Sequence, residues 1–525
     1  MTRHGLAKAA SIVAFLTVVS KVLGFLREAS LAAVFGATSD TDAYLVAQTI
    51  PYLLFATVSY ALTTTFIPVY SHVREESGKE AGFRFATTVI WAVLCVGILL
   101  VTAGEILARP LVRLVAPGFD AAVADLTAYL SRIIFPMMIF QLLSGVMTGI
   151  LQAEGQFAVP TAAGLAQNAS IITSIVVFGP RHGIASVAVG TLVGAGLATI
   201  VMIPALRQTG FQWTATLDLR DPSLKRVATL MLPAIIGAGA GQLNTLVDRI
   251  LASGLPEGSV SALNYANRLM QLVPSIIGAS VVTVAYPTLA QMAARQDRKG
   301  FTEGLVDALG LLHFMLVPIA VGVFVLREPF VRVVYERGVF DAAATEETAW
   351  ALLFLSLGIA IFTMRDLVSR AFFALQDTTT PMILGMVTVC VNIVLNLLLV
   401  GPLRQGGLAL ATTVASLIGL ALGLLAFRRK SAVGFPARRL LSTVLRTGFA
   451  SVVMGVVVWA AYSKIQSVMR WHGSFLELIP VGLVVALGAL VYLLMVWILR
   501  VPELMFVLDT ARRGLSELRG RLTGK

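Results

Sequence analysis

The sequence predicts an all-α integral membrane protein with about 14 transmembrane helices. The first observation is composition: 57% of the 525 residues are hydrophobic and only 13% are charged. The second is that apolar runs long enough to cross a bilayer recur along the whole chain. The third is that Lys and Arg gather in alternate connections, as in polytopic membrane proteins. A soluble enzyme would not have this composition.

Each predicted transmembrane helix is an apolar run that approaches or exceeds the ~20 residues needed to cross a bilayer. The first run is long and lacks a small-residue cleavage site, so no cleavable signal is expected. The runs cover residues 9–36, 42–72, 84–107, 122–152, 158–178, 183–206, 226–252, 259–291, 304–326, 345–374, 380–400, 406–427, 440–463 and 475–499.

The distribution of basic residues predicts the orientation of the chain. Connections after even-numbered runs, together with the two termini, hold roughly 23 Lys and Arg, against roughly 9 on the other side. Both termini are therefore expected in the cytoplasm. The same distribution accounts for the net charge of +12 without a nucleic-acid partner.

The chain contains an internal repeat of about 220 residues, the arrangement of transporters built from two parallel halves. Setting Pro68 on Pro287 aligns Asp42 with Ser261, and Pro160 falls near Pro381. This repeat predicts two six-helix lobes related by a pseudo-two-fold axis, followed by two further helices. The expected domains are residues 1–215, residues 216–430, and residues 431–525, which end in a basic cytoplasmic tail.

The first run carries three ionisable residues, Lys21, Arg27 and Glu28. With about 100° of rotation per residue, they fit in one wedge of the helix. Charges in lipid are costly, so this wedge is expected to face protein or a water-filled cavity. Two simpler alternatives remain open. Lys21 and Arg27 could extend to the membrane interfaces, or Arg27 and Glu28 could only neutralise each other.

Further polar residues lie in the runs of the second half. Asn267, Arg268 and Gln271 share one helical stripe, and Arg365 and Arg370 lie in the tenth run. Arginine offers a planar fork suited to phosphate, so a cavity rich in Arg favours an anionic substrate. The alternative is structural pairing, in which Asp248 pairs with Arg249 or Arg268 and Asp366 pairs with Arg365 or Arg370.

Several kinds of site are not indicated by the sequence. Cys95 and Cys390 are far apart in apolar runs, and the five histidines lack metal-ligand spacing. No phosphate-binding loop of the nucleotide-hydrolysing type is present, because Gly78-Lys79 lacks the preceding glycine and the following Ser or Thr. Transport powered by ATP is therefore not expected.

Several motifs resemble the MurJ/MviN family of bacterial lipid II flippases, which belongs to the MATE-related exporter superfamily. They cover about residues 5–430 and include SKVLGFLRE, FGATSDTDAYLVAQTIP, FIPVYSHV, LPAIIGAGAGQLNTLVDRILAS, YANRLMQLVPSIIGASVVTVAYPTLA and ALQDTTTP. The resemblance implies transport, not catalysis, of the undecaprenyl-diphosphate-linked peptidoglycan precursor across the bacterial inner membrane. It also implies two lobes around a cationic cavity and a groove for the lipid tail beside the last two helices.

The resemblance also assigns substrate-binding residues. Two departures from the family bear on this phosphate site. The family's second-helix Arg is replaced by apolar residues around Phe55, and Asn267 and Gln271 stand where some members carry acids. The phosphate site is therefore expected to be weaker or differently built. The family's positions fall on Lys21 (in place of the usual Arg), Arg27, Glu28, Asp42 and Arg268.

Some members of the family have a sodium site between the seventh, eleventh and twelfth helices. All-oxygen ligands suit a hard cation, so Na⁺ is the expected coupling ion, and no other cofactor is expected. Polar contacts between helices are the alternative. The corresponding residues here are Asp248, Asn392, Asn396, Leu408 (through its carbonyl) and Thr412.

The expected partners are lipid II in the membrane and cell-wall synthesis enzymes, with the chain acting as a monomer in peptidoglycan biosynthesis and cell-shape maintenance. Two rival functions remain open. One is export of another lipid-linked oligosaccharide or of small drugs, although a drug exporter would favour acidic groups in its cavity. The other is a membrane glycosyltransferase, which would need a carboxylate on a sizeable outer loop, whereas these loops are short.

Overall fold

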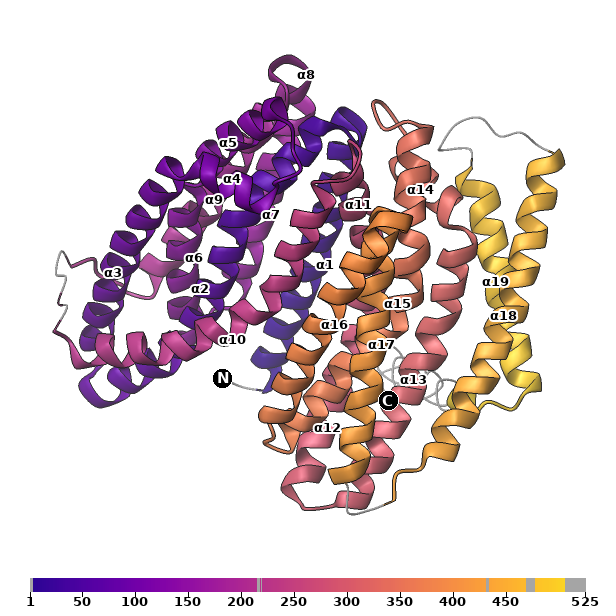
Figure 1. Ribbon diagram of the computed structural model, residues 1–525. Coiled ribbons are helices and arrows are strands. Elements are labelled where there is room, and N and C mark those ends of the chain that lie inside the picture. The colour runs from indigo at the N-terminus through magenta and orange to yellow at the C-terminus, as the bar shows by residue number, and fades with distance from the viewer. Residues whose placement is uncertain (1–2, 215–217, 219, 431–433, 469–476, 506–525) are drawn as a thin grey trace, which may run out of the picture. The chain divides into compact units, whose positions relative to one another are not determined.

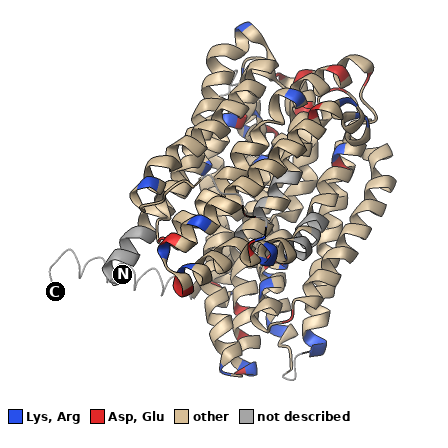
Figure 2. Cartoon of the chain, turned by 90° about the vertical axis from the view of Figure 1, so that its left-hand side faces the viewer, with Lys and Arg blue, Asp and Glu red and all other residues tan. Residues whose placement is uncertain are grey.

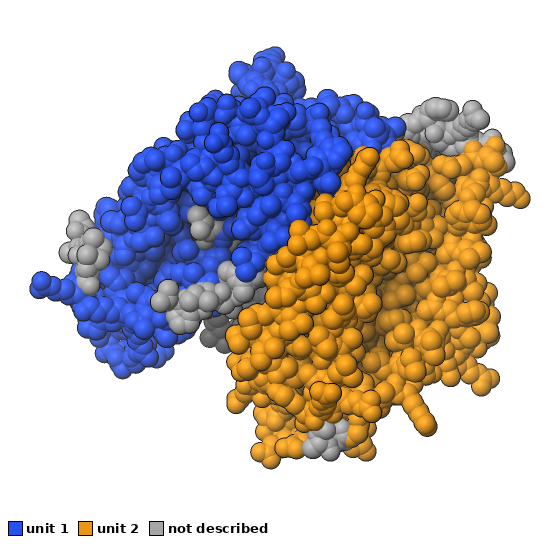
Figure 3. Space-filling model, in the orientation of Figure 1, with its two compact units in different colours: residues 1–261, 337–344 blue, residues 262–336, 345–525 orange. Residues whose placement is uncertain are grey.

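The computed structural model describes residues 3–214, 218, 220–430, 434–468 and 477–505. Across these ranges every regular element is helical, which confirms the predicted class. The chain forms two compact units (Figure 3). The N-terminal unit comprises Met1–Ser261 and Arg337–Ala344, and the C-terminal unit comprises Ala262–Glu336 and Thr345–Lys525. The basic residues of the predicted tail, Arg512, Arg513, Arg519, Arg521 and Lys525, lie outside the described residues.

The N-terminal unit is built from long helices, with short helices at their ends (Figure 1). Two breaks have local causes: Pro136 separates α5 from α6, and a π-helical turn, η1, follows α7. The elements are α1 (Arg3–Phe35), α2 (Ser39–Ser77), α3 (Lys79–Ile106), α4 (Ala108–Val115), α5 (Ala121–Ile134), α6 (Met137–Ala153), α7 (Ala158–Thr173), η1 (Ser174–Phe178), α8 (Gly179–His182), α9 (Ile184–Gln208) and α10 (Pro222–Ala252).

The core of this unit forms where α2 packs against α3 and α6. Phe66 stacks on Tyr70 and Phe85, with ring centroids 5.5 and 5.9 Å apart. Such pairs contribute about 0.5–1.5 kcal/mol each beyond the burial of their area. Helix α1 packs against α7, which in turn packs against α9. The polar wedge of α1 therefore has α7 as a neighbour.

The C-terminal unit begins with α11, whose first turn belongs to the N-terminal unit. Helix α13 packs against α12 and α18, α18 against α19, and α16 against α17. Tyr492 of α19 joins that helix to α13 by donating a hydrogen bond to the Phe314 carbonyl at 2.7 Å. The elements are α11 (Ser259–Val273), η2 (Pro274–Gly278), α12 (Ala279–Ala294), α13 (Arg298–Val325), α14 (Arg327–Tyr335), α15 (Ala342–Ala374), α16 (Thr379–Leu403), α17 (Gln405–Lys430), α18 (Ala437–Val468) and α19 (Leu478–Ile498).

Residues Arg337–Ala344 follow α14 in the chain but pack in the N-terminal unit. The Val339 N–H donates to the Ala33 carbonyl at 2.9 Å. Gly338 has φ +61°, and a Cβ there would lie 2.1 Å from the Ala33 oxygen. Glycine is therefore required at 338 by both the backbone conformation and the close approach of α1.

Eleven helical segments in the described residues are long and apolar enough to cross a membrane. Three further long helices, α1, α2 and α10, correspond to the first, second and seventh predicted runs and have 33, 39 and 31 residues. The expected total of about 14 is consistent with this set. Figure 2 shows long stretches of helix without charged residues, which is the pattern a bilayer requires.

The unit boundary at Ser261 differs from the repeat boundary at residues 215/216. Helix α10 begins the second sequence repeat, yet it packs against α2 and belongs to the N-terminal unit. The three-domain division remains a prediction from the repeat. The structural units instead show that one helix and the segment Arg337–Ala344 from the second repeat complete the first unit.

Candidate functional site

Arg27, a predicted substrate-binding residue, is held by contacts with two other side chains. One of its guanidinium nitrogens, Nη2, lies 2.7 Å from Glu28 Oε1, and the other, Nη1, donates to Asn168 Oδ1 of α7 at 3.2 Å. Glu28 is buried, whereas the Arg27 side chain is 26% exposed. The guanidinium is thus held by two neighbours while part of it stays accessible. Lys21, six residues earlier on α1, is exposed.

Arg27 and Glu28 form an ion pair, as expected if the two residues neutralise each other. Neutralisation alone does not account for Asn168, which supplies a second contact from a different helix. A side chain fixed on two sides is pre-organised, so it loses less conformational entropy when it binds a ligand.

Asp42, near the start of α2, is fully engaged within the N-terminal unit. Its Oδ1 accepts from the backbone N–H of Ser261 at 2.7 Å and from the Ser261 hydroxyl at 2.6 Å. Its Oδ2 accepts from the Gly258 N–H at 2.9 Å. These contacts are those of a residue that joins α2 to the first turn of α11 and to Gly258 just before it. Its assignment to substrate binding remains a prediction.

The predicted residues of α11 differ in their surroundings. Arg268 and Gln271 are exposed, whereas Asn267 is partly buried. The Asn267 side-chain amide donates to the Leu263 carbonyl one turn earlier, at 3.0 Å. Arg268 and Gln271 are therefore the accessible members of the predicted stripe, whereas the Asn267 amide is bonded to its own helix.

The two arginines of α15 have different local partners. Arg365 is partly buried, and its Nη1 donates to the Ser416 hydroxyl of α17 at 3.2 Å. Arg370 pairs with Asp366 one turn earlier, at 2.9 Å, and both side chains are about half exposed. The structural pairing considered for Asp366 therefore exists with Arg370. Neither arrangement tests whether these residues bind substrate.

Four of the five predicted sodium ligands form one connected chain of polar groups between α16 and α17. Asn396 donates to Asn392 Oδ1 at 3.1 Å, Asn392 donates to the Thr412 hydroxyl at 3.2 Å, and Thr412 donates to the Leu408 carbonyl at 3.0 Å. Both asparagines are completely buried. The oxygen atoms available as cation ligands belong to amide, hydroxyl and carbonyl groups, which suit a hard cation.

Asp248, the fifth predicted ligand, lies on α10 in the N-terminal unit, whereas the other four lie in the C-terminal unit. Asp248 has a polar partner in the structure. The described residues include no group of three or more His, Cys, Asp or Glu that could hold a metal ion. A cation site here would therefore depend on the neutral oxygens of α16 and α17.

Sequence reasoning missed Asn168 and Ser416, which contact Arg27 and Arg365. Both are polar residues inside predicted transmembrane runs, and polar residues there usually face a partner. That signal was present for Asn168, but its partner depends on how α1 packs against α7. Ser416 gave a weaker signal, because a serine in a transmembrane helix can bond its own backbone.

The family model described as lipid II flippase MurJ matches residues 31–479. A probable lipid II flippase MurJ from Rhizobium meliloti is 31% identical, covering 85% of this chain and 84% of the relative. A probable lipid II flippase MurJ from Bdellovibrio bacteriovorus is 29% identical and covers 95% of both chains.

Solved structures give the same result. The structure titled lipid II flippase MurJ, inward closed conformation, matches with a TM-score of 0.79 and 26% identity, over 93% of this chain and 98% of that one. An inward-facing MATE family multidrug resistance transporter shares the fold, with a TM-score of 0.67 and 14% identity. The match of the family model over most of the chain, together with these relatives, establishes the classification: the chain is a member of the lipid II flippase MurJ family.

Proposed function

We propose that the chain flips lipid II from the cytoplasmic to the outer leaflet of the bacterial inner membrane, for peptidoglycan synthesis. The observation that carries the proposal is the family match over residues 31–479, which spans both units. The family is one of transporters, so the chain acts as a flippase and not as an enzyme. Its charge distribution favours cytoplasmic termini.

In this proposal Arg27 binds the diphosphate of the substrate. Glu28 and Asn168 fix the guanidinium from two sides, so its exposed edge is oriented before the substrate arrives. Charge-assisted hydrogen bonds from a planar fork suit phosphate oxygens better than a point charge does. Lys21, Arg268, Arg365 and Arg370 would supply further positive charge during the passage of the head group.

Alternating access requires that the two units change their relative orientation while substrate is bound. A coupling ion can bias such a change only if it binds one state more tightly than the other. We propose Na⁺ as that ion, held by the side-chain and backbone oxygens of Asn392, Asn396, Leu408 and Thr412 in the C-terminal unit. A cation there would exchange the present amide hydrogen bonds for oxygen coordination.

The test is translocation of fluorescent lipid II in proteoliposomes that contain the purified protein. Wild type should expose the label to an external reductant, and Arg27→Ala should not. Arg181→Ala is the matched control, because Arg181 is an exposed arginine of the same unit. Transport by the Arg27→Ala variant at the wild-type rate would contradict the assigned role of Arg27.

Export of small cationic drugs is the second candidate, favoured by the fold shared with the MATE family transporter. The same proteoliposomes distinguish the two functions. A flippase moves lipid II and ignores a soluble cationic dye, whereas a drug exporter accumulates the dye. Absence of lipid II movement together with dye transport would overturn the proposed function as a whole.

A further inference from the structure

Two short helices occupy equivalent positions in the two sequence repeats. The register that sets Pro68 on Pro287 also sets LARPLVRLV (107–115) on LREPFVRVV (326–334). Helix α4 therefore corresponds to α14, and Arg113 corresponds to Arg332. Each helix directly follows a membrane-spanning helix, α3 or α13, so each lies at a membrane interface.

The two equivalent arginines have different partners. Arg332 Nη1 lies 2.9 Å from Glu477 Oε1, and its Nε lies 3.3 Å from Glu336 Oε2. Glu477 is buried and also accepts a hydrogen bond from the Tyr462 hydroxyl. The C-terminal unit thus supplies two carboxylates to its arginine. Within the described part of the chain, Arg113 has neither a hydrogen bond nor an ion pair.

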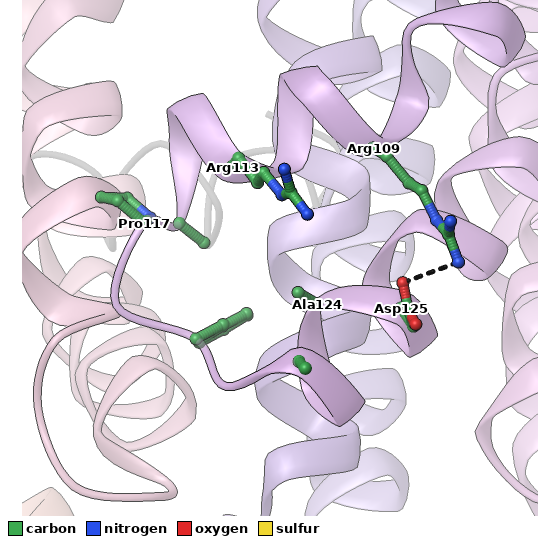
Figure 4. Close-up of a pocket in the computed structure, with 8 residues that line it drawn as sticks. Arg109, Arg113, Pro117, Ala124 and Asp125 are labelled. Carbon is green, nitrogen blue, oxygen red and sulfur yellow. Dashed lines mark ion pairs between the residues drawn. The ribbon is translucent and has the colours of Figure 1, made fainter.

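Arg113 lines a cavity of about 500 Å³ between α4 and α5 (Figure 4). Arg109, one helical turn earlier, lines the same cavity and pairs with Asp125 at 3.0 Å. Both members of that pair are more than 60% exposed, so the pair is weak and its arginine can also reach a second anion. Two arginines against one aspartate leave the cavity with a net positive charge.

The surroundings of the cavity are apolar and exposed. Ile106, Leu107 and Leu114 are 71%, 47% and 66% exposed at the end of α3 and on α4. A soluble anion would make no use of these side chains. A phospholipid would use both features, since its phosphate suits the arginines and its acyl chains suit the neighbouring apolar surface.

We propose that this cavity binds the phosphate of an anionic phospholipid. The phosphate takes the place around Arg113 that the carboxylates of Glu336 and Glu477 take around Arg332. The volume is in the range of small-ligand sites, about 300–1,000 Å³, and accommodates a lipid head group. In the proposed topology this interface is the outer one, and the bound lipid ties the connection between α3 and α5 to the bilayer.

The first experiment measures lipid binding to the full-length protein in a non-ionic detergent by native mass spectrometry. The probes are phosphatidylglycerol and a diacylglycerol with the same acyl chains but no phosphate. Wild type should bind phosphatidylglycerol in preference to diacylglycerol, and Arg113→Gln should weaken that binding roughly tenfold. Arg181→Gln, an exposed arginine of the same unit outside this cavity, should bind as wild type does.

Equal binding of phosphatidylglycerol by wild type and Arg113→Gln would overturn the proposal. Displacement of the lipid by glycerol phosphate at equal concentration would also overturn it, because the site would then be one for soluble anions.

A second variant tests the comparison between the repeats directly. Pro117 is exposed, lines the cavity and follows Arg113 by four residues, the spacing that separates Glu336 from Arg332. Pro117→Glu should supply an internal carboxylate and weaken phosphatidylglycerol binding as Arg113→Gln does. Pro117→Ala, the matched control, should leave binding unchanged. The same affinity for phosphatidylglycerol in both Pro117 variants would contradict the proposal. A thermal unfolding transition like that of wild type shows that each variant is folded.

Discussion

Asp42 and Ser261, which the sequence repeat aligns with each other, are joined by two hydrogen bonds to the same carboxylate oxygen. The Ser261 N–H and hydroxyl donate to Asp42 Oδ1 at 2.7 and 2.6 Å, and the Gly258 N–H donates to Oδ2 at 2.9 Å. Equivalent positions of the two repeats thus carry a complementary acceptor and donor. The contact joins the start of α2 to the start of α11.

This junction predicts the effect of two substitutions on stability. Ser261→Ala removes the hydroxyl donor to a buried carboxylate and should lower the free energy of unfolding by about 1–3 kcal/mol. Asp42→Ala should cost more, because it leaves the donors of Ser261 and Gly258 without their acceptor. Thermal unfolding in detergent measures both effects. Asp40→Ala, an exposed aspartate two residues earlier, is the control, and an equal loss in that variant would contradict the assignment.

Asn168 is predicted to position Arg27 without binding the substrate itself. Asn168→Ala removes the 3.2 Å contact and should raise the lipid II concentration needed for half-maximal flipping by roughly tenfold, with a maximal rate near that of wild type. Arg27→Ala should lose flipping at every concentration, and Arg27→Lys should recover little of it. A fall in maximal rate alone for Asn168→Ala would argue against a positioning role.

The connection between α15 and α16 should respond to acid. Hydrogen bonds from Lys430 and Thr380 lower the pKa of Asp377 from 3.8 to about 2. The folded-state pKa lies below the unfolded one, so this stabilisation is complete above pH ~4 and is lost as pH falls toward about 2. The difference in melting temperature between wild type and Asp377→Asn should therefore shrink between pH 5 and pH 2.5. A constant difference across that range would contradict the assignment.

Sodium dependence is expected if the oxygens between α16 and α17 hold the coupling ion. Wild type should melt at a higher temperature in sodium than in choline buffer of equal ionic strength, because a ligand that binds the folded state stabilises it. Asn392→Ala should abolish the difference. Asn168→Ala, a substitution of another asparagine in a membrane-spanning helix, should retain it. A wild-type melting temperature that is the same in the two salts would rule out the ion site.

The sequence predicted the features that depend on regular spacing. Apolar runs of bilayer length located the helices, and the four-residue spacing of Asn392 and Asn396 placed them together on α16, where they do bond. Features that depend on packing between helices escaped prediction. Asn168 is 141 residues from Arg27, and nothing local connects them before α1 packs against α7.

The sequence repeat does not locate the boundary between the two compact units. The repeat identified positions that are equivalent in the two halves, such as Asp42 and Ser261. It carried no information on which half α10 packs against, because that depends on its contacts with α2.

The segment Arg337–Ala344 has a consequence for biosynthesis. Chains emerge from the ribosome amino terminus first, and domains usually fold in that order. Here the N-terminal unit receives its last segment, with the Val339 contact to Ala33, only after α11 to α14 have been synthesised. A nascent chain halted at residue 261 therefore lacks a part of its first unit. Until residue 344 has been translated, α1 lacks the segment that packs against it, and the insertion machinery must keep α1 in place without that contact.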